Sequence, residues 1–216
     1  MTRLQPRSVA GFLFTCSHLP DTILPMRVIT FDIETKNLFQ DVGSNNPADL
    51  DISVICAHDS QSGEITSYLE ADFKKLWPLL EQADAFVTWN GDHFDIPLLN
   101  KYYPGDLSKI KSIDLMKEVQ LVLGRRLKLD SVGEATLGRN KSGHGLDAIE
   151  WWRNGEVDKI IKYCIEDVRL TRDLYDFAKN NGHLKYKEVG NLKEIKLNTK
   201  TWEEPVTHTL TYTLPF

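Results

Sequence analysis

The chain has 216 residues, of which 41% are hydrophobic and 26% are charged, and its formal net charge is −5. This composition excludes a disordered or fibrous protein, and the length predicts one domain with a sizeable core. The net acidity argues against a broadly basic nucleic-acid coat but leaves room for a local basic groove.

The cysteine pattern indicates a reducing compartment, and the hydropathy of the sequence predicts neither a membrane span nor a secretory signal. Cys16, Cys56 and Cys164 are far apart and form no C-x-x-C pair, so neither a disulfide framework nor a zinc site is predicted. No apolar run approaches the roughly 18 residues that span a bilayer, and the stretch 10–16 is too short for a secretory signal. We therefore expect a cytoplasmic protein without a membrane partner.

Strand and helix signals alternate from Met26 onward, and residues 1–25 are interpreted as an N-terminal tail or an upstream start. The predicted strands are 28–34, 52–57, 64–68, 85–89 and 112–114. The predicted helices are 72–82, 94–103, 115–123, 131–137, 147–152 and 156–179. The polar stretch 37–49 is predicted to be a long loop.

This order of elements predicts an α/β fold. The first three strands follow one another closely and favour an antiparallel meander, whereas the later strands alternate with helices that would flank a mixed sheet. We assign residues 26–182 to this domain and residues 183–216 to a C-terminal extension. Thr-rich alternation around 206–214 predicts an extended or hairpin-forming segment there.

The sequence VITFDIET, at 28–35, puts two carboxylates on one face of the first strand. Asp32 and Glu34 are two residues apart and share a face, whereas Phe31 and Ile33 would point the other way, into a core. Adjacent carboxylates repel each other and are rarely buried unless a cation offsets their charge. The pair therefore predicts a site for a hard metal ion.

A second acidic segment, TWNGDHFDIPLL at 88–99, joins a strand to a helix. The strand ends near Asn90, and the helix begins near Phe94 with Asp95 in its first turn, where Pro97 is tolerated. Taken alone, an Asp at a helix start is more often a cap than a ligand.

The third segment, YCIEDVRLT at 163–171, lies within the long C-terminal helix. Tyr163 and Asp167 are four residues apart and project from the same side, one turn from each other. Ile160, Cys164 and Val168 form an adjacent apolar stripe that would attach the helix to the sheet. On its own, such a Tyr and Asp pair is more often a surface contact.

Taken in order, the three segments resemble the motifs of the DEDDy exonucleases, most closely those of the proofreading domain of family-B DNA polymerases and its stand-alone relatives. KLDSVGEATLG, at 128–138, resembles the stretch before the last motif. Lys162 stands where the DEDDh enzymes carry a His, so the chain resembles the Tyr type. The resemblance covers roughly 28–178 and implies a ribonuclease H-like fold, which the order of elements fits.

The resemblance implies a metal-dependent 3′–5′ exonuclease that acts on single-stranded DNA ends. Asp32 would bridge two divalent cations, Glu34 and Asp167 would complete the site of the cation carrying the attacking water, and Asp95 would hold the second cation through water. Tyr163 would orient the attacking water, because a phenol with a pKa of about 10 is a poor base at neutral pH. Four carboxylates without His or Cys favour Mg²⁺ or Mn²⁺.

The motif residues Asn90 and Phe94 are the candidate substrate contacts. Further aromatic residues either stack on unpaired bases or belong to the core, and the sequence leaves both open: Trp89, Tyr102, Trp151 and Trp152. A local basic concentration either meets phosphates or is a solvated patch: Arg125, Arg126, Lys128, Arg139 and Lys141.

Three other functions stay open at this point. The substrate could be RNA, because the motifs address the phosphodiester and not the sugar. The chain could instead be a non-catalytic module that binds nucleic acid or acts as a scaffold, or a structure-specific endonuclease. It is too short to contain a polymerase domain as well, so we expect it to work alone, as an oligomer, or with a separate polymerase or helicase.

Overall fold

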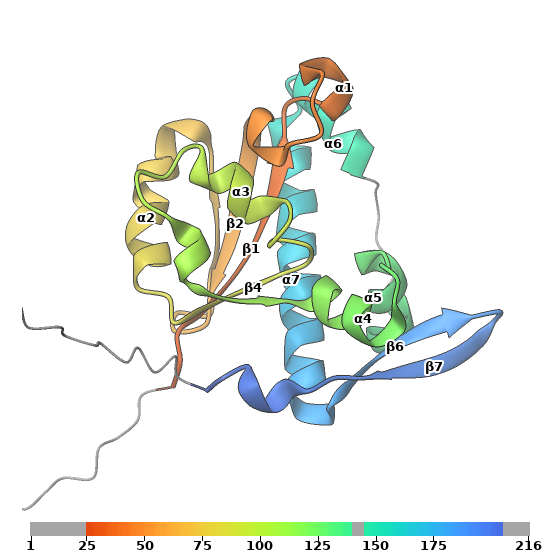
Figure 1. The fold of residues 1–216 in the computed structure, drawn as a ribbon. Helices are drawn as coiled ribbons and strands as arrows, with labels where there is room; N and C mark the ends of the chain where they lie inside the picture. Colours follow the sequence, from red (N-terminus) through yellow and green to blue (C-terminus); the bar gives the residue numbers. More distant parts are fainter. Residues whose placement is uncertain (1–24, 140–144, 205–216) are drawn as a thin grey trace, which may run out of the picture.

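The computed structural model describes residues 25–139 and 145–204. Its centre is a five-stranded mixed sheet with the strand order β3-β2-β1-β4-β5 (Figure 1). The strands are β1 (Val28–Thr35), β2 (Ile52–Asp59), β3 (Ile65–Tyr68), β4 (Ala85–Thr88) and β5 (Lys111–Asp114).

The pairing of the strands confirms the predicted mixed sheet. β1 pairs antiparallel with β2, and β2 pairs antiparallel with β3, which gives the expected meander. β4 adds to the other side of β1 in parallel, and β5 adds to β4 in parallel. β1 is therefore the central strand, and the acidic segment that it carries lies in the middle of the domain.

Helices cover both faces of the sheet. The helices are α1 (Phe39–Val42), α2 (Phe73–Glu81), α3 (Asp95–Asn100), α4 (Leu115–Leu123), α5 (Leu129–Leu137), α6 (Gly145–Arg153) and α7 (Val157–Asn181). α2 and α3 share one apolar core with the sheet, whereas α4, α5, α6 and α7 pack on its other face. Figure 1 shows α7 running the length of the sheet.

The apolar stripe of α7 attaches this helix to the sheet as predicted. Ile160, Cys164 and Val168 are completely buried in one cluster with Val54 and Cys56 of β2. β2 is buried on both faces, which explains its nearly continuous apolar sequence. None of the described helices is long and apolar enough to cross a membrane.

Most predicted elements agree with the structure to within two residues at each end, but two predictions need correction. The segment 37–49 is not a plain loop, because it contains α1 and a 3₁₀ turn at Pro47–Asp49, which Asn46 caps by accepting from the N–H of Ala48. The predicted helix 94–103 ends earlier, at Asn100, whose side chain accepts a hydrogen bond from the N–H of Leu107. Short 3₁₀ turns also lie at Glu70–Asp72, Leu107–Lys109 and Thr199–Thr201.

A two-stranded hairpin follows α7. It consists of β6 (His183–Glu188) and β7 (Asn191–Lys196), and Figure 1 shows it projecting beyond α4 and α5. Its inner side chains Leu184, Tyr186 and Ile195 are buried in the core that α4, α5 and α7 share. The sequence had pointed to a hairpin or extended segment around 206–214, which lies outside the described residues.

Candidate metal centre

Three carboxylates from two elements converge beside β1. Asp32 and Glu34 lie on one face of the strand, and Asp167 reaches them from α7; one carboxylate oxygen from each lies within 4.8 Å of the other two. Glu34 and Asp167 are buried, and Asp32 is half-buried. The result is an all-oxygen donor set, which suits Mg²⁺ or Mn²⁺ better than Zn²⁺.

Buried cysteines fix α7 against the strand that carries the acidic pair. The Cys164 thiol donates a hydrogen bond to the main-chain carbonyl of Asp32 at 3.3 Å. Cys56 stands opposite Asp32 in the pairing of β1 with β2, and both cysteines are fully buried and free. Because Cys164 precedes Asp167 by about one helical turn, this contact fixes the position of Asp167 along the length of β1.

Asp95 is the first residue of α3, and only 4% of it is exposed. Its pKa is raised to about 8, chiefly by burial and then by the negative charge of Asp114, with a smaller contribution from Asp167. Hydrogen bonds from its own N–H and from that of Ile33 in β1 lower the pKa only in part. Asp95 therefore faces the same region as the other acids, although it lies outside the three-carboxylate group.

The Asp95 carboxylate fits a cation better than it fits a cap. Neither Asp95 nor Asp92 caps α3 through its side chain, and Asp92 instead forms an ion pair with Lys117. Within the described residues, Oδ1 of Asp95 is buried and has no hydrogen-bond partner. A buried carboxylate oxygen near other negative charges has lost its hydration, and no hydrogen bond replaces it. A bound cation would offset this unfavourable free energy.

Tyr163 lies one turn before Asp167 and is buried. Its pKa is raised by burial and by the negative charges of Asp167, Glu34 and Asp32, in that order. The phenol therefore stays protonated at neutral pH and above, so it can donate a hydrogen bond but cannot act as a base. Its ring packs edge-on against Trp151, with the centroids 5.9 Å apart.

Asp114 is a buried carboxylate of this region that sequence analysis missed. It accepts hydrogen bonds from the N–H of Asn90 at 2.8 Å and of Asp92 at 3.2 Å, and it also caps α4 through the N–H groups of Met116 and Lys117. Burial raises its pKa, and these N–H groups oppose the rise. An Asp directly before an apolar helix predicts the cap, but nothing local predicts the bonds to the loop after β4.

The loop between β4 and α3 is tightly constrained. Asn90 adopts a φ of +74°, and a Cβ on Gly91 would lie 2.3 Å from Oγ1 of Thr88, so only glycine fits there. The N–H of Gly91 donates to that Oγ1 at 3.2 Å. Oδ1 of Asn90 is buried without a hydrogen-bond partner among the described residues, and Phe94 is half-buried against Phe39.

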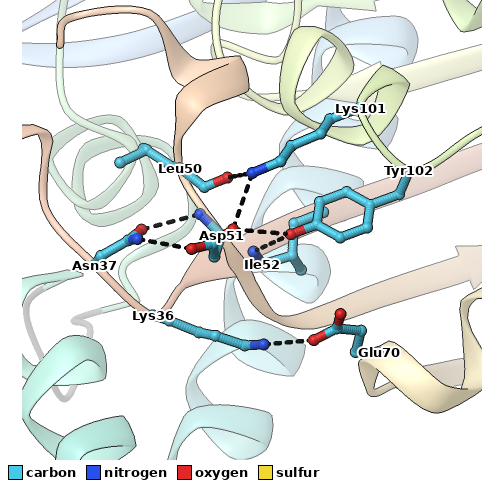
Figure 2. Close-up of polar contacts among 8 residues, drawn as sticks. All are labelled: Lys36, Asn37, Leu50, Asp51, Ile52, Glu70, Lys101 and Tyr102. Carbon is cyan, nitrogen blue, oxygen red and sulfur yellow. Dashed lines mark hydrogen bonds and ion pairs between the residues drawn. The ribbon is translucent and has the colours of Figure 1, made fainter. Parts of the chain in front are cut away.

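Tyr102 is held in place by hydrogen bonds to the start of β2. Figure 2 shows its hydroxyl accepting from the N–H of Ile52 at 3.2 Å and donating to Asp51 at 3.5 Å. The ammonium group of Lys101 bonds to the carbonyl of Leu50 at 2.8 Å and to Asp51 at 2.9 Å. These bonds fasten the end of α3 to the start of β2.

The same hydrogen-bond network also holds Asn37, which lies just after the acidic pair of β1. The side chain of Asn37 donates to Asp51 at 3.0 Å and accepts from the Asp51 N–H at 2.9 Å (Figure 2). Lys36 forms an ion pair with Glu70, and its ammonium lies 5.1 Å from the ring centroid of Trp152. The exit of β1 is thus held in place just beyond Glu34.

Some of the remaining candidate substrate contacts are engaged within the protein, and others are exposed. Trp89 is half-buried and packs against the core. Arg125 pairs with Glu188 and Arg139 pairs with Asp173. Arg126 and Lys128 are exposed and form no ion pair within the described part of the chain, and Lys141 lies outside it.

Comparison with known proteins places this fold. A comparison with curated proteins finds no match. Among solved structures, the family B DNA polymerase from the hyperthermophilic archaeon Pyrobaculum calidifontis is similar, with a TM-score of 0.57 and 19% identity. The match covers 71% of this chain and 24% of the polymerase, and at this identity it shows the fold alone. A family model described as RNase_H superfamily matches residues 29–179, so the chain belongs to the RNase H superfamily.

Proposed function

We propose that this protein is a metal-dependent 3′–5′ exonuclease of the DEDDy type that hydrolyses phosphodiester bonds at the 3′ end of single-stranded DNA. The observation that carries the proposal is the convergence of Asp32, Glu34 and Asp167, from β1 and α7, to within 4.8 Å. Structural packing alone does not favour three carboxylates at one point, two of them buried.

The carboxylates have distinct roles in this proposal. Asp32, Glu34 and Asp167 would hold one Mg²⁺ or Mn²⁺, and Asp95, with Asp32, would hold a second. The buried acceptor of Asp95 supports this division, because its position outside the three-carboxylate group suits a neighbouring ion. Divalent cations held by these carboxylates would supply an activated water and would stabilise the departing oxygen.

Tyr163 orients the attacking water through its hydroxyl. Its raised pKa keeps the phenol protonated, so its contribution is hydrogen bonding and not proton removal. Asn90 and Phe94 are the proposed contacts to the terminal nucleotides, and the partial exposure of Phe94 supports this role.

DNA is the favoured substrate because the similar solved structure is a DNA polymerase, which is an argument from fold-level analogy. RNA is the alternative within the same chemistry. A non-catalytic binding module is less favoured, since all four carboxylates and the tyrosine of the motifs are present. The protein would act alone, as an oligomer, or together with a separate polymerase or helicase.

Incubation with 5′-labelled single-stranded DNA and RNA tests the proposal. In Mg²⁺ or Mn²⁺ the labelled DNA should shorten as a ladder from its 3′ end, and EDTA should abolish the reaction. Absence of any metal-dependent cleavage would support the binding-module alternative. Cleavage of circular single-stranded DNA would indicate an endonuclease instead.

A further inference from the structure

The tip of the β6–β7 hairpin keeps a residue that its backbone disfavours. Val189 and Gly190 form the turn with φ values of +49° and +77°, the combination found in type I′ hairpin turns. Glycine adopts such angles freely, but a β-branched valine is strained there, and Asn-Gly is the preferred pair. Val189 is also 95% exposed, so core packing does not explain its presence.

Other exposed apolar side chains lie at the same end of the molecule. Leu192 at the start of β7 is 56% exposed, and Leu121 and Val122 in the last turn of α4 are 74% and 51% exposed. α4 packs beside β7, and the α4–α5 loop meets the hairpin tip where Arg125 bonds to Glu188 at 3.2 Å. All but one of the well-exposed large apolar side chains in the described residues are found here.

Basic residues lie on the same hairpin and on the loop that follows α4. They are Arg125, Arg126, Lys128, Lys187 and Lys193. They outnumber their carboxylate partners, Glu188 and Glu134, in a chain whose net charge is −5. We call these five basic residues, together with Leu121, Val122, Val189 and Leu192, the hairpin-tip surface. Its charge is complementary to a polyanion.

Helix α5 packs against α7, which carries Asp167, and against β6 of the hairpin. Within α5, a Cβ on Gly133 would lie 2.8 Å from Cδ1 of Leu170, which follows Asp167 by about one turn of α7. Farther along α5, the hydroxyl of Thr136 accepts from the N–H of Lys185 at 2.9 Å and donates to its carbonyl at 3.2 Å. α5 therefore contacts both the helix that carries Asp167 and β6 of the hairpin.

We propose that the hairpin-tip surface binds the part of the nucleic-acid strand that precedes the terminal nucleotides, so the preferred substrate is a strand long enough to reach it. The basic side chains would contact phosphates, and the aliphatic side chains would contact the sugars and bases between them. The inference rests on the proposed nuclease function. It accounts for the retention of a strained, exposed valine, since such strain persists where function requires it.

The substitution Val189→Asn distinguishes an effect on stability from an effect on nucleic-acid binding. The substitution creates the favoured Asn-Gly turn and removes the apolar side chain, so the melting temperature should stay the same or rise while affinity for a strand of about 20 nucleotides falls several-fold. Affinity is measured by fluorescence anisotropy in EDTA, where cleavage does not interfere. A variant that binds this strand as tightly as the wild type would show that Val189 makes no contact.

A triple substitution tests the basic residues. In Arg126→Gln, Lys128→Gln and Lys193→Gln combined, the slope of log affinity against log salt concentration should fall by about 2, because about three phosphate contacts to a single strand are lost. The matched control replaces three exposed lysines of α2 and of the 3₁₀ turn Leu107–Lys109: Lys74, Lys75 and Lys109. Figure 1 shows α2 on the side of the domain away from the hairpin. An equal loss in both triple variants would reduce the effect to net charge and overturn the proposed surface.

Cleavage of a tetranucleotide distinguishes the two proposals. In Mg²⁺ the triple variant should cleave it at the wild-type rate, while cleavage of the long strand at low concentration slows about tenfold, in proportion to lost binding. If the wild type cleaves neither substrate, the proposed function is wrong. If the wild type cleaves both and the variant matches it on the long strand, the hairpin-tip surface is wrong and the nuclease function stands.

Discussion

The carboxylate of Asp114 accepts a hydrogen bond from the main-chain N–H of Asn90 at 2.8 Å, across 24 residues of sequence. This bond ties the end of β5 to the loop that follows β4, where Asn90 adopts a left-handed conformation. Because α3 starts directly after this loop, the position of Asp95 depends on it. Asp114 is thus a positioning residue for a proposed metal ligand.

Asp114→Asn should weaken both the fold and the nuclease. An amide keeps the size of the carboxylate but accepts fewer hydrogen bonds, which should cost about 1.5–3 kcal/mol of unfolding free energy. The loop carrying Asn90 would then hold α3 less firmly, so Mn²⁺ affinity and cleavage rate should both fall. Denaturant unfolding, calorimetric metal titration and a cleavage assay measure the three effects.

Asp106→Asn is the matched control for that substitution. Asp106 also caps a helical turn, by accepting from the N–H of Ser108 at 3.1 Å, but it is exposed and lies in a different loop. This variant should leave metal affinity and cleavage unchanged. Equal losses of metal affinity in the two variants would mean that Asp114 acts only through general stability.

Tyr163→Phe should retain the fold and lose part of the cleavage rate. The ring contact with Trp151 is preserved, whereas the hydroxyl that would orient the water is lost. The rate constant should fall roughly tenfold to a hundredfold, with metal affinity unchanged. Tyr103→Phe is the control, because the Tyr103 hydroxyl bonds only to exposed Glu81 within the described residues. Equal rates for Tyr163→Phe and the wild type would remove Tyr163 from the proposed reaction.

Metal-free protein should lose stability as the pH rises toward 8. The pKa of Asp95 is about 8 in the folded protein and 3.8 as its ordinary value, so the folded state retains a proton that the unfolded state releases. The stability from this proton is complete below pH 4 and is lost as the pH rises through about 8. Melting temperatures in EDTA between pH 5 and pH 8 should therefore decline more steeply for the wild type than for Asp95→Asn. Parallel curves for the two proteins would show that Asp95 does not titrate in this way.

Adding metal should reverse this loss of stability. Mn²⁺ at about a hundredfold excess over its dissociation constant should stabilise the folded protein by about 2.7 kcal/mol. Ca²⁺ and Mg²⁺ should act in the same direction, and the effect should be reduced in Asp167→Asn. A melting temperature that does not respond to any of these ions would contradict a metal centre at this position.

Local sequence patterns predicted the central features of the fold. The alternation around Asp32 and Glu34 and the apolar stripe at Ile160, Cys164 and Val168 are short-range signals that the sheet and α7 preserve. The sequence also identified the three carboxylates that the structure brings together, because the three segments taken in order resemble a known set of motifs, although Asp167 alone would suggest a surface contact.

Features that depend on distant contacts were not predictable. The bonds of Asp114 to the β4–α3 loop form only when β4 and β5 pair. A hairpin was expected within the extension 183–216, but its position at 183–196 was not predicted, because Val189-Gly190 lacks the usual Asn-Gly turn signal. The short helical turns within 37–49 were not predicted, because segments of three or four residues are too short to show a helical periodicity in the sequence. The turn at Pro47–Asp49 is stabilised by the Asn46 cap and by the burial of Pro47.

Cleavage by Asp32→Asn tests the central claim most directly. The variant keeps the shape of the side chain and removes the charge that would bridge the two cations. Once circular dichroism shows that it is folded, its action on 5′-labelled single-stranded DNA in Mg²⁺ is compared with that of the wild type. We predict a 3′-shortening ladder for the wild type and a rate at least about a thousandfold lower for the variant. Wild-type cleavage by folded Asp32→Asn would contradict the proposed metal-dependent nuclease centre.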